Sequence, residues 1–383
     1  MTVGPFGIDP VIWAVLRLVI AVALASFVLL TGALAQTLLE RKVLAVMQDR
    51  LGPYHTGPFG LLQSVADAIK LLGKEDIRAK LTDAPFFLAA PALVFSPILA
   101  SFVVLPFAPD VIGANLNVGL LYLTTLGSMT VLGIVIAGWA SNNKYSLMGG
   151  LRSAGQLISY EVPQILGLVT VVLYVGSLSM VDITNAQPGP LINVFILPMA
   201  FVTYFIAALA ETNRAPFDLP EAESELVAGF LTEYSGMRWG VFFLAEYGAI
   251  TVVSAIMTTL WFGGWHGPGV DSLPILGLLW FTLKTYVFVL AFMWIRATLP
   301  RLRIDQLMGF CWKVLIPLAL VNILLTAVLI LAFEDPRLPI AIVNWLLVAV
   351  LVIGLPFTQR RRLLRFRSRT GESVGMRDAR LTP

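Results

Sequence analysis

A run of acidic residues is the part of this chain whose residue types and spacing could do chemistry. Five carboxylates fall within fifteen residues: Glu211, Asp218, Glu221, Glu223 and Glu225. Carboxylates that crowd together away from bulk water raise one another's proton affinity and titrate as a coupled set. A group of side chains that passes protons needs this behaviour. The run is therefore a candidate proton relay.

The same run has structural explanations. Asp218 and Glu221, with Pro220 between them, have the spacing of a helix N-cap and its partner three residues later. A solvated acidic loop is the other ordinary explanation, but neighbours such as Phe217 and Leu219 make the surroundings too apolar for a free loop. Helix capping would explain Asp218 and, in part, Glu221. The remaining acids have no such structural explanation and stay candidates for the proton relay.

Two further carboxylates extend the candidate relay toward the membrane. Glu246 lies within the apolar run 239–262, where an unpaired charge is costly and must face protein or water. Glu161 stands at the expected start of a span, where a favourable interaction with the helix N-terminus could also explain it. Lys284, midway along another apolar run, must likewise find protein or water.

The elements that must position these groups are apolar runs of membrane-spanning length. Of 383 residues, 58% are hydrophobic and 13% charged, and the mean hydropathy is +0.85. Such runs predict an all-α polytopic membrane protein with about nine transmembrane helices. The expected spans are 11–33, 85–107, 118–140, 160–180, 190–210, 239–262, 273–295, 312–333 and 338–357. Residues 1–357 would form one helix bundle, followed by a basic tail, 358–383.

The distribution of lysine and arginine predicts the orientation. One alternating set of loops, with the tail, holds 22 of the 26 basic residues, so this set is expected on the cytoplasmic side. The set comprises 34–84, 141–159, 211–238, 296–311 and 358–383. The N-terminus would then be external and the C-terminus cytoplasmic, and the basic tail favours a bacterial plasma membrane. In this arrangement the arginines of 296–303 could balance the acidic run.

Residues 59–74 have the pattern of a short amphipathic helix on the cytoplasmic side. Five apolar residues share one helical face, whereas four polar residues share the other. The apolar set is Leu61, Leu62, Val65, Ile69 and Leu72, and the polar set is Gln63, Asp67, Lys70 and Lys74. Such a helix suits the membrane interface, although simple packing against neighbours explains it equally well.

The chain offers few ligands for a redox cofactor. It has one cysteine, Cys311, and two histidines, His55 and His266, whereas thiolate iron–sulfur ligation takes about four cysteines. No metal-ligand spacing, phosphate-binding glycine motif or hydrolytic triad is visible, and nothing points to nucleic acid. From the residues alone, two classes remain: a proton-handling subunit of a membrane redox complex, and an ion-coupled transporter.

Several motifs resemble one known family. They are Glu-Arg-Lys at 40–42, Gln-Asp-Arg-Leu-Gly-Pro at 48–53, Leu-Leu-Gln-Ser-Val-Ala-Asp-Ala-Ile-Lys at 61–70, Ser-Asn-Asn-Lys-Tyr-Ser at 141–146, Ser-Tyr-Glu at 159–161, the acidic stretch 211–226 and Arg-Ala-Thr-Leu-Pro-Arg-Leu-Arg-Ile-Asp-Gln at 296–306. In this order, from about residue 10 to 330, the chain resembles the H subunits of proton-translocating NADH:quinone oxidoreductase, respiratory complex I. The tail lies outside the motifs.

The resemblance implies a membrane subunit that forms much of the quinone chamber and carries no redox cofactor. The residues near the quinone path would be Arg41, Asp67, Lys70 and Arg296. The chain of ionisable groups leading into the membrane arm would be Glu161, Glu211, Arg214, Asp218, Glu221, Glu223, Glu225 and Glu246. Ubiquinone or menaquinone would be the substrate.

The resemblance also implies partner subunits that contain flavin and iron–sulfur clusters. One peripheral subunit would carry the terminal iron–sulfur cluster, and other membrane-arm subunits and the lipid bilayer would surround the chain. The equivalent subunit of a membrane-bound hydrogenase-type complex is the alternative, because such subunits share the acidic motif. An ion-coupled transporter fits the motifs less well.

Overall fold

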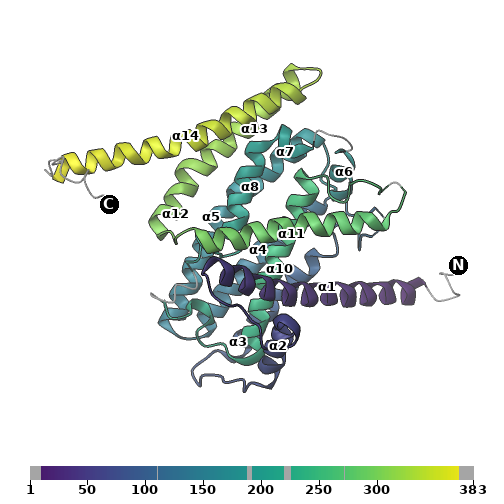
Figure 1. Cartoon of the computed structure of the whole chain (residues 1–383), viewed down its shortest axis with the longest axis vertical. Coiled ribbons are helices and arrows are strands. Elements are labelled where there is room, and N and C mark those ends of the chain that lie inside the picture. The colour runs from purple at the N-terminus through teal and green to yellow at the C-terminus, as the bar shows by residue number, and fades with distance from the viewer. Residues whose placement is uncertain (1–9, 110, 188–191, 220–225, 271, 371–383) are drawn as a thin grey trace.

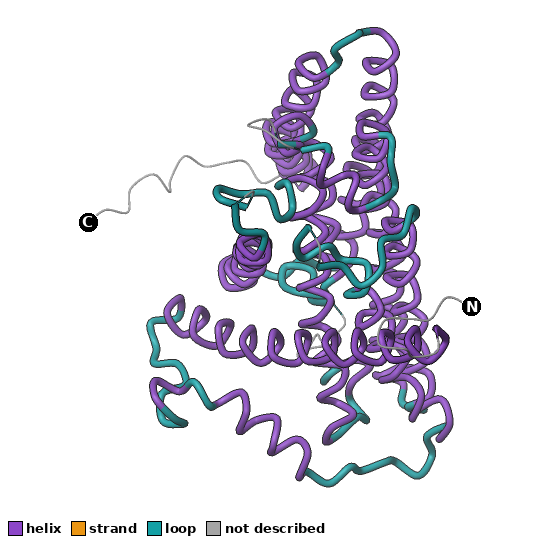
Figure 2. The backbone as a smooth tube through the Cα atoms, turned by 90° about the vertical axis from the view of Figure 1, so that its right-hand side faces the viewer, coloured by secondary structure: helices purple, strands orange, loops and turns teal. Residues whose placement is uncertain are grey.

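The computed structural model describes residues 10–109, 111–187, 192–219, 226–270 and 272–370; for 10–25 and 354–370 it describes the backbone path. In these ranges the regular elements are helices, apart from one isolated β-bridge between Ala108 and Val111 (Figure 2). Six helical stretches there are long and apolar enough to cross a membrane. The predicted fold class, an all-α polytopic membrane protein, is therefore confirmed.

Each of the nine expected spans overlaps a helix. These helices are α1 (Pro10–Met47), α3 (Ala84–Ser101), α4 (Gly119–Ala140), α5 (Lys144–Val175), α8 (Pro198–Glu211), α10 (Gly236–Trp261), α11 (Ile275–Thr298), α13 (Ile316–Ala332) and α14 (Arg337–Thr370). Shorter elements are η2 (Pro58–Gly60), α2 (Gln63–Gly73), α6 (Met180–Asn185), α7 (Asn193–Ile196), η3 (Gly229–Leu231), α12 (Ile304–Phe310) and η4 (Cys311–Leu315). Figure 1 shows α11 beside α1 and α14 extending away from the bundle.

The fourth span begins earlier than expected, and this changes the setting of Glu161. The helix starts at Lys144 rather than near residue 160, because the Asn143 side chain accepts a hydrogen bond from the Tyr145 N–H at 2.9 Å and caps it. Glu161 consequently lies in the interior of α5. The explanation of this carboxylate by a helix N-terminus is therefore wrong.

The predicted amphipathic helix is present as α2. Its polar face is internally paired: Gln63 donates to Asp67 at 3.2 Å, and the Lys70 ammonium lies 3.7 Å from the same carboxylate. The apolar residues that flank or line the opposite face, Leu61, Leu62, Val65, Ile69 and Leu72, are all exposed. α2 packs on α1 and α10, so one face of it is covered by protein and its apolar side chains remain outside.

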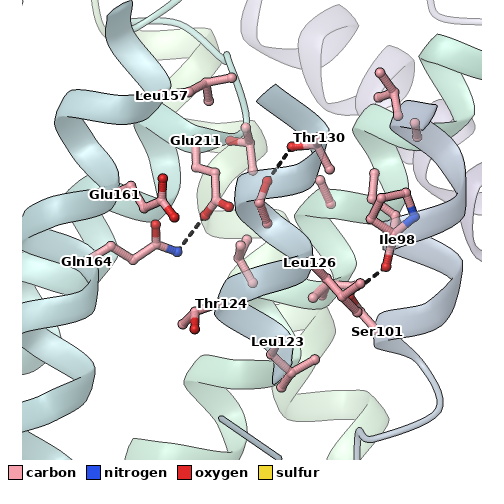
Figure 3. A pocket seen from close by; sticks show the side chains of 18 of the residues that line it. Ile98, Ser101, Leu123, Thr124, Leu126, Thr130, Leu157, Glu161, Gln164 and Glu211 are labelled. Carbon is pink, nitrogen blue, oxygen red and sulfur yellow. Dashed lines mark hydrogen bonds between the residues drawn. The ribbon is translucent and has the colours of Figure 1, made fainter. Parts of the chain in front are cut away.

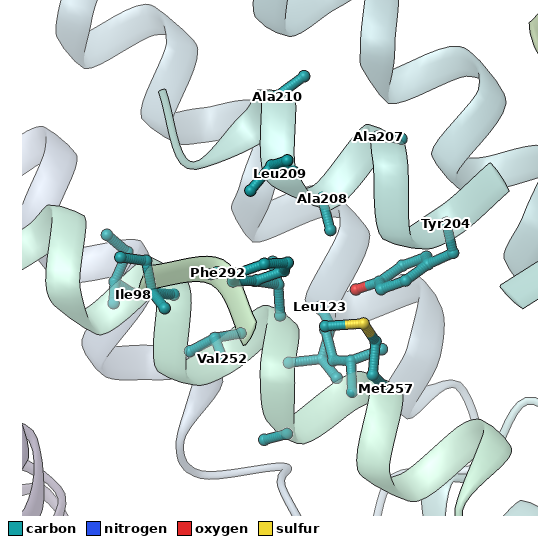
Figure 4. Packing of buried hydrophobic residues seen from close by; sticks show 14 of the residues in the cluster. Ile98, Leu123, Tyr204, Ala207, Ala208, Leu209, Ala210, Val252, Met257 and Phe292 are labelled. Atoms are coloured by element: carbon teal, nitrogen blue, oxygen red, sulfur yellow. The ribbon is translucent and has the colours of Figure 1, made fainter. Parts of the chain in front are cut away.

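The core around the acidic groups is built from α4, α5, α8 and α10. α5 packs along both α4 and α8, and α10 packs against α1, α3 and α11. The fully buried alanines Ala207, Ala208 and Ala210 let α8 approach its neighbours closely (Figure 4). A Cβ at Gly149 would lie 2.5 Å from Gly229 Cα, so glycine is required where α5 meets η3.

Lys284 lies at the far end of α10 from the acidic run. Its ammonium donates to the carbonyls of Phe262 (2.7 Å), Gly264 (3.1 Å) and His266 (2.7 Å), just beyond the last residues of α10. The carbonyls at a helix C-terminus lack partners within the helix and favour a cation. Lys284 therefore has a structural role: it caps α10 through the Phe262 carbonyl and fixes α11 to the loop that follows, through Gly264 and His266.

Replacement of Lys284 by methionine is expected to destabilise the protein by about 2 kcal/mol, because charge-assisted hydrogen bonds to three carbonyls are lost. The measurement is the midpoint of thermal unfolding of the purified, detergent-solubilised protein in its native assembly. Thr282→Val, which removes a hydroxyl bonded only to Leu278 O of the same helix, is the matched control. An unchanged midpoint in Lys284→Met would contradict the capping role.

Candidate functional site

The buried centre of the site is a cluster of two carboxylates and two guanidinium groups. Arg214 Nη1 donates to Glu40 Oε1 at 2.9 Å, and Arg214 Nε lies 2.7 Å from Glu246 Oε1. Arg296 forms a second ion pair with Glu40. The side chains of Arg214 and Glu40 are only 4% and 6% exposed. Because the four formal charges cancel, the cluster is tolerated away from water.

Tyr247 completes this arginine cluster, which we define as Glu40, Arg214, Glu246, Tyr247 and Arg296. The phenol donates to Glu40 Oε2 at 2.6 Å, so both oxygens of that carboxylate are engaged. The guanidinium carbon of Arg214 lies 4.7 Å from the centre of the Tyr247 ring, a cation–π contact. Carboxylates therefore balance the charge of Arg214, and the Tyr247 ring packs near its guanidinium group.

Segments distant in sequence meet at the arginine cluster. Glu40 lies on α1, Glu246 and Tyr247 on α10, Arg296 near the end of α11, and Arg214 in the loop after α8. That loop is held to α5 by the buried Gln156, whose amide donates to the carbonyls of Ala210 (2.8 Å) and Phe217 (2.7 Å). α5 thus sets the position from which Arg214 reaches across to α1 and α10.

A second group of acids surrounds an internal cavity beside this cluster. Figure 3 shows Glu161 and Gln164 of α5 converging on Glu211, the last residue of α8. Ser128 of α4 donates to Glu161, and the amide of Gln164 donates to Glu211. We call these four residues the cavity group.

The cavity has a volume of about 110 Å³. About 10–15 Å³ of space measured in this way is enough for one water molecule, so the cavity has room for several. Its wall is mostly apolar, but it includes Glu161, Glu211 and Glu246. Glu246 therefore belongs to both regions, since it is paired with Arg214 and also faces the cavity. Acids from α5, α8 and α10 therefore share one mostly apolar cavity.

A third group of charges lies on the surface formed by α1 and α2. Arg41 forms an ion pair with Asp67, and Lys70 is the further partner of that carboxylate. The side chains are more exposed than those of the arginine cluster, at 48% for Arg41 and 71% for Lys70. Because Arg41 directly follows Glu40, this surface group is adjacent in the chain to the buried cluster.

The structure brings together most of the described residues that the sequence analysis selected, in three groups. Arg41, Asp67 and Lys70 meet on the surface, whereas Arg296 lies apart from them, on Glu40. Glu161 joins Glu211, and Arg214 joins Glu246.

The acidic run itself is described only in part. Asp218 is half-buried between Phe217 and Leu219, and the loop that carries it touches the 299–303 segment, where the Leu302 N–H donates to Pro216 O at 3.0 Å. Glu221, Glu223 and Glu225, and with them the predicted N-cap arrangement of Asp218 and Glu221, lie outside the described residues. The counter-charge predicted from 296–303 goes, for Arg296, to Glu40.

Sequence reasoning missed several residues that organise the site. Glu40 entered the sequence analysis only as part of the Glu-Arg-Lys motif at 40–42, and Tyr247 was not selected. Gln156 and Gln164 were also passed over, although they recur eight residues apart on α5 with Tyr160 between them, which places all three on one helical stripe. Amides repeated on one stripe of an apolar helix were the available signal.

Comparisons with known proteins agree on one family. A family model described as NADH dehydrogenase matches residues 19–327. The H subunits of NADH-quinone oxidoreductase from several bacteria are close in sequence. That of Brevibacillus brevis is 54% identical over 294 residues, covering 76% of this chain and 86% of that protein. That of Protochlamydia amoebophila is 51% identical (78% and 92% covered), and that of Chlorobaculum parvum is 47% identical (86% and 94% covered).

Replacement of Arg214 by methionine is expected to prevent stable accumulation of the protein in membranes, because Glu246 loses this counter-charge and Glu40 is left with Arg296. Breaking a buried ion pair on one side costs about 3–5 kcal/mol. The measurement is the amount of chain in isolated membranes, by immunoblot. Arg337→Met, which removes an exposed partner 3.9 Å from Asp335, is the matched control and should cost less than about 1 kcal/mol.

The double variant Glu40→Gln with Arg214→Met tests the pairing itself. Removing both charges should restore part of the accumulation that Arg214→Met loses, because less uncompensated charge stays buried. A double variant that accumulates less than the single variant would argue against the ion-pair explanation.

Proposed function

The chain belongs to the NADH dehydrogenase family, and we propose that it is the membrane subunit of an NADH:quinone oxidoreductase that links quinone reduction to proton translocation. The observation that carries the proposal is the continuity of the three charged groups. Surface charges on α1 and α2 adjoin the arginine cluster, and Glu246 joins that cluster to the acids of the cavity.

The proposed quinone path runs along α1 and α2. A quinone has an apolar tail and a polar head, and this part of the molecule offers both exposed apolar side chains and the charged residues Arg41, Asp67 and Lys70. Arg296, which is partly exposed and paired with Glu40, would lie deeper on the same path. We propose either ubiquinone or menaquinone as the substrate.

Reduction of a quinone to a quinol takes up two electrons and two protons. With one cysteine and two histidines, the chain has few ligands for electron carriers, so we propose that flavin and iron–sulfur clusters are held by partner subunits. One of these is a peripheral subunit with the terminal iron–sulfur cluster, and others are neighbouring membrane-arm subunits. This chain would supply the chamber and the route for charge.

The effect of a change of charge at the quinone would reach the surface charges on α1 and α2 first, then the arginine cluster, and then the acids of the cavity. A change of charge near Arg41 is felt at the adjacent Glu40, whose partner Arg214 also holds Glu246. A change in the ion pair of Glu246 with Arg214 would alter the electric field at Glu161 and Glu211, which line the same mostly apolar cavity. Asp218, Glu221, Glu223 and Glu225 are proposed as further members of this relay.

We further propose a bacterial plasma membrane location, with the N-terminus external and the C-terminus cytoplasmic. The support is the asymmetry of basic residues, including eight arginines in the tail 358–383. The acidic run and the α1–α2 surface would then face the cytoplasm, where the peripheral subunits would bind.

The relay predicts that Glu211→Gln and Glu223→Gln each lower quinone-linked NADH oxidation by at least about tenfold, the scale of removing one proton-transfer group. NADH reduction of a hydrophilic acceptor, which bypasses this chain, should be unchanged. Both rates are measured in membranes that contain the assembled complex. Asp335→Asn, an exposed carboxylate outside the relay, is the control. Normal quinone activity in both glutamine variants would refute the proposed relay.

The topology predicts that a peptide tag fused after Pro383 is reached by a protease only from the cytoplasmic side. Right-side-out and inverted membrane vesicles are treated in parallel, and loss of the tag is followed by immunoblot. Cleavage in inverted vesicles alone is expected. Cleavage in right-side-out vesicles alone would require a different number of spans.

A further inference from the structure

The buried carboxylates of the site are of two kinds, distinguished by what holds them. Glu40 and Glu246 each contact arginine within 3 Å. Glu161 and Glu211 are held instead by neutral donors, the Ser128 hydroxyl and the Gln164 amide. Within the described part of the chain, no lysine, arginine or histidine nitrogen lies within 4 Å of either of these two carboxylates.

The two kinds of carboxylate are therefore expected to differ in how firmly the ionised form is favoured. An adjacent guanidinium stabilises the ionised form of a carboxylate, so Glu40 and Glu246 are fixed as anions by Arg214 and Arg296. A neutral donor in a small apolar cavity fixes neither form as strongly, because burial opposes the charge that the hydrogen bond favours. Within the described residues, Glu161 and Glu211 are therefore the acids of the cavity that no contacting cation fixes as anions.

The Glu211 carboxylate is held in place from two sides. Gln164 lies three residues after Glu161 on α5, so the two side chains share a face, and its Nε2 donates to Glu211 Oε2 (Figure 3). On α4, a Cβ at Gly127 would lie 3.1 Å from Glu211 Oε1, so the absence of a side chain there makes room for the carboxylate. Its position depends on both neighbours.

We propose that Gln164 is a positioning residue that holds Glu211 across the cavity from Glu161, so that one proton passes between the two acids through cavity water. In the transfer the carboxyl of one residue loses its O–H proton and becomes a carboxylate, the other carboxylate becomes a carboxyl, and no electron moves. The amide itself gains and loses no proton. This inference rests on the proposed function and adds a residue to its relay.

The surroundings of the pair contain few other groups that titrate. Glu246 faces the cavity from α10 with Arg214 behind it, and Tyr204 faces it from α8. Among the described residues, α3, α4 and η3 contribute only uncharged side chains to the wall, such as Ser101, Thr130 and Phe230. Glu246 and Tyr204 are therefore the other titratable groups that face the pair from the described cavity wall.

The test is the pH profile of quinone-linked NADH oxidation in membranes with assembled complex, normalised to NADH reduction of a hydrophilic acceptor. In Gln164→Leu the donor is lost, which favours the protonated form of Glu211, so the profile should move to higher pH by about one unit. Thr170→Val, which removes a hydroxyl bonded only to Leu166 O on the same helix, should keep the wild-type profile.

Gly127→Ala is a second variant that leaves Gln164 intact. The added methyl group would lie 3.1 Å from Glu211 Oε1, so the carboxylate must shift slightly relative to Gln164. Alanine suits a helix better than glycine, so the chain should still fold. The same direction of shift is expected as in Gln164→Leu. Wild-type profiles in both variants would overturn the positioning role.

A double variant separates this inference from the proposed function. If Gln164 acts through Glu211, then Gln164→Leu combined with Glu211→Gln should be no slower than Glu211→Gln alone. Additive losses would overturn the inference, because Gln164 would then act elsewhere. Normal activity of Glu211→Gln itself would instead refute the relay, whatever the profile of Gln164→Leu.

Discussion

The burial of one guanidinium group, that of Arg214, is the constraint on which the rest of the site depends. A charge that is 4% exposed needs opposite charge in contact, and Glu40 and Glu246 provide it from α1 and α10. α1 and α10 must therefore both approach Arg214, which lies in the loop after α8. Gln156 fixes that loop from α5, so a single electrostatic requirement determines how four segments are placed.

The arginine cluster and the cavity group stabilise buried carboxylates by different interactions. The arginine cluster balances each carboxylate with a cation, which makes it neutral and firmly held. The cavity group uses hydroxyl and amide donors, which satisfy hydrogen bonding without settling the charge. Glu246 belongs to the arginine cluster and also faces the cavity. A disturbance of the arginine cluster therefore alters the electric field at the cavity group.

Hydropathy predicted the helices well, since their length is dictated by the membrane, and charge located the acidic region. Neither pattern could predict contacts: Gln164 meets Glu211 across 47 residues of chain, and Gln156 meets Phe217 across 61. Glu161 was misinterpreted because the cap at Asn143 extends α5 beyond its most apolar part. Glu40 was undervalued because charged residues after a span are common, and only its burial distinguishes it.

The cap formed by Lys284 has a mechanical consequence. α10 is held in its middle by the ion pair of Glu246 with Arg214, and the loop that follows its last residue is held by the Lys284 ammonium through three carbonyls. These two attachments restrain movement of α10 along its own axis. A displacement of the arginine cluster would therefore act on the part of α10 between these two points, where Ala249, Val252, Val253 and Ile256 line the cavity.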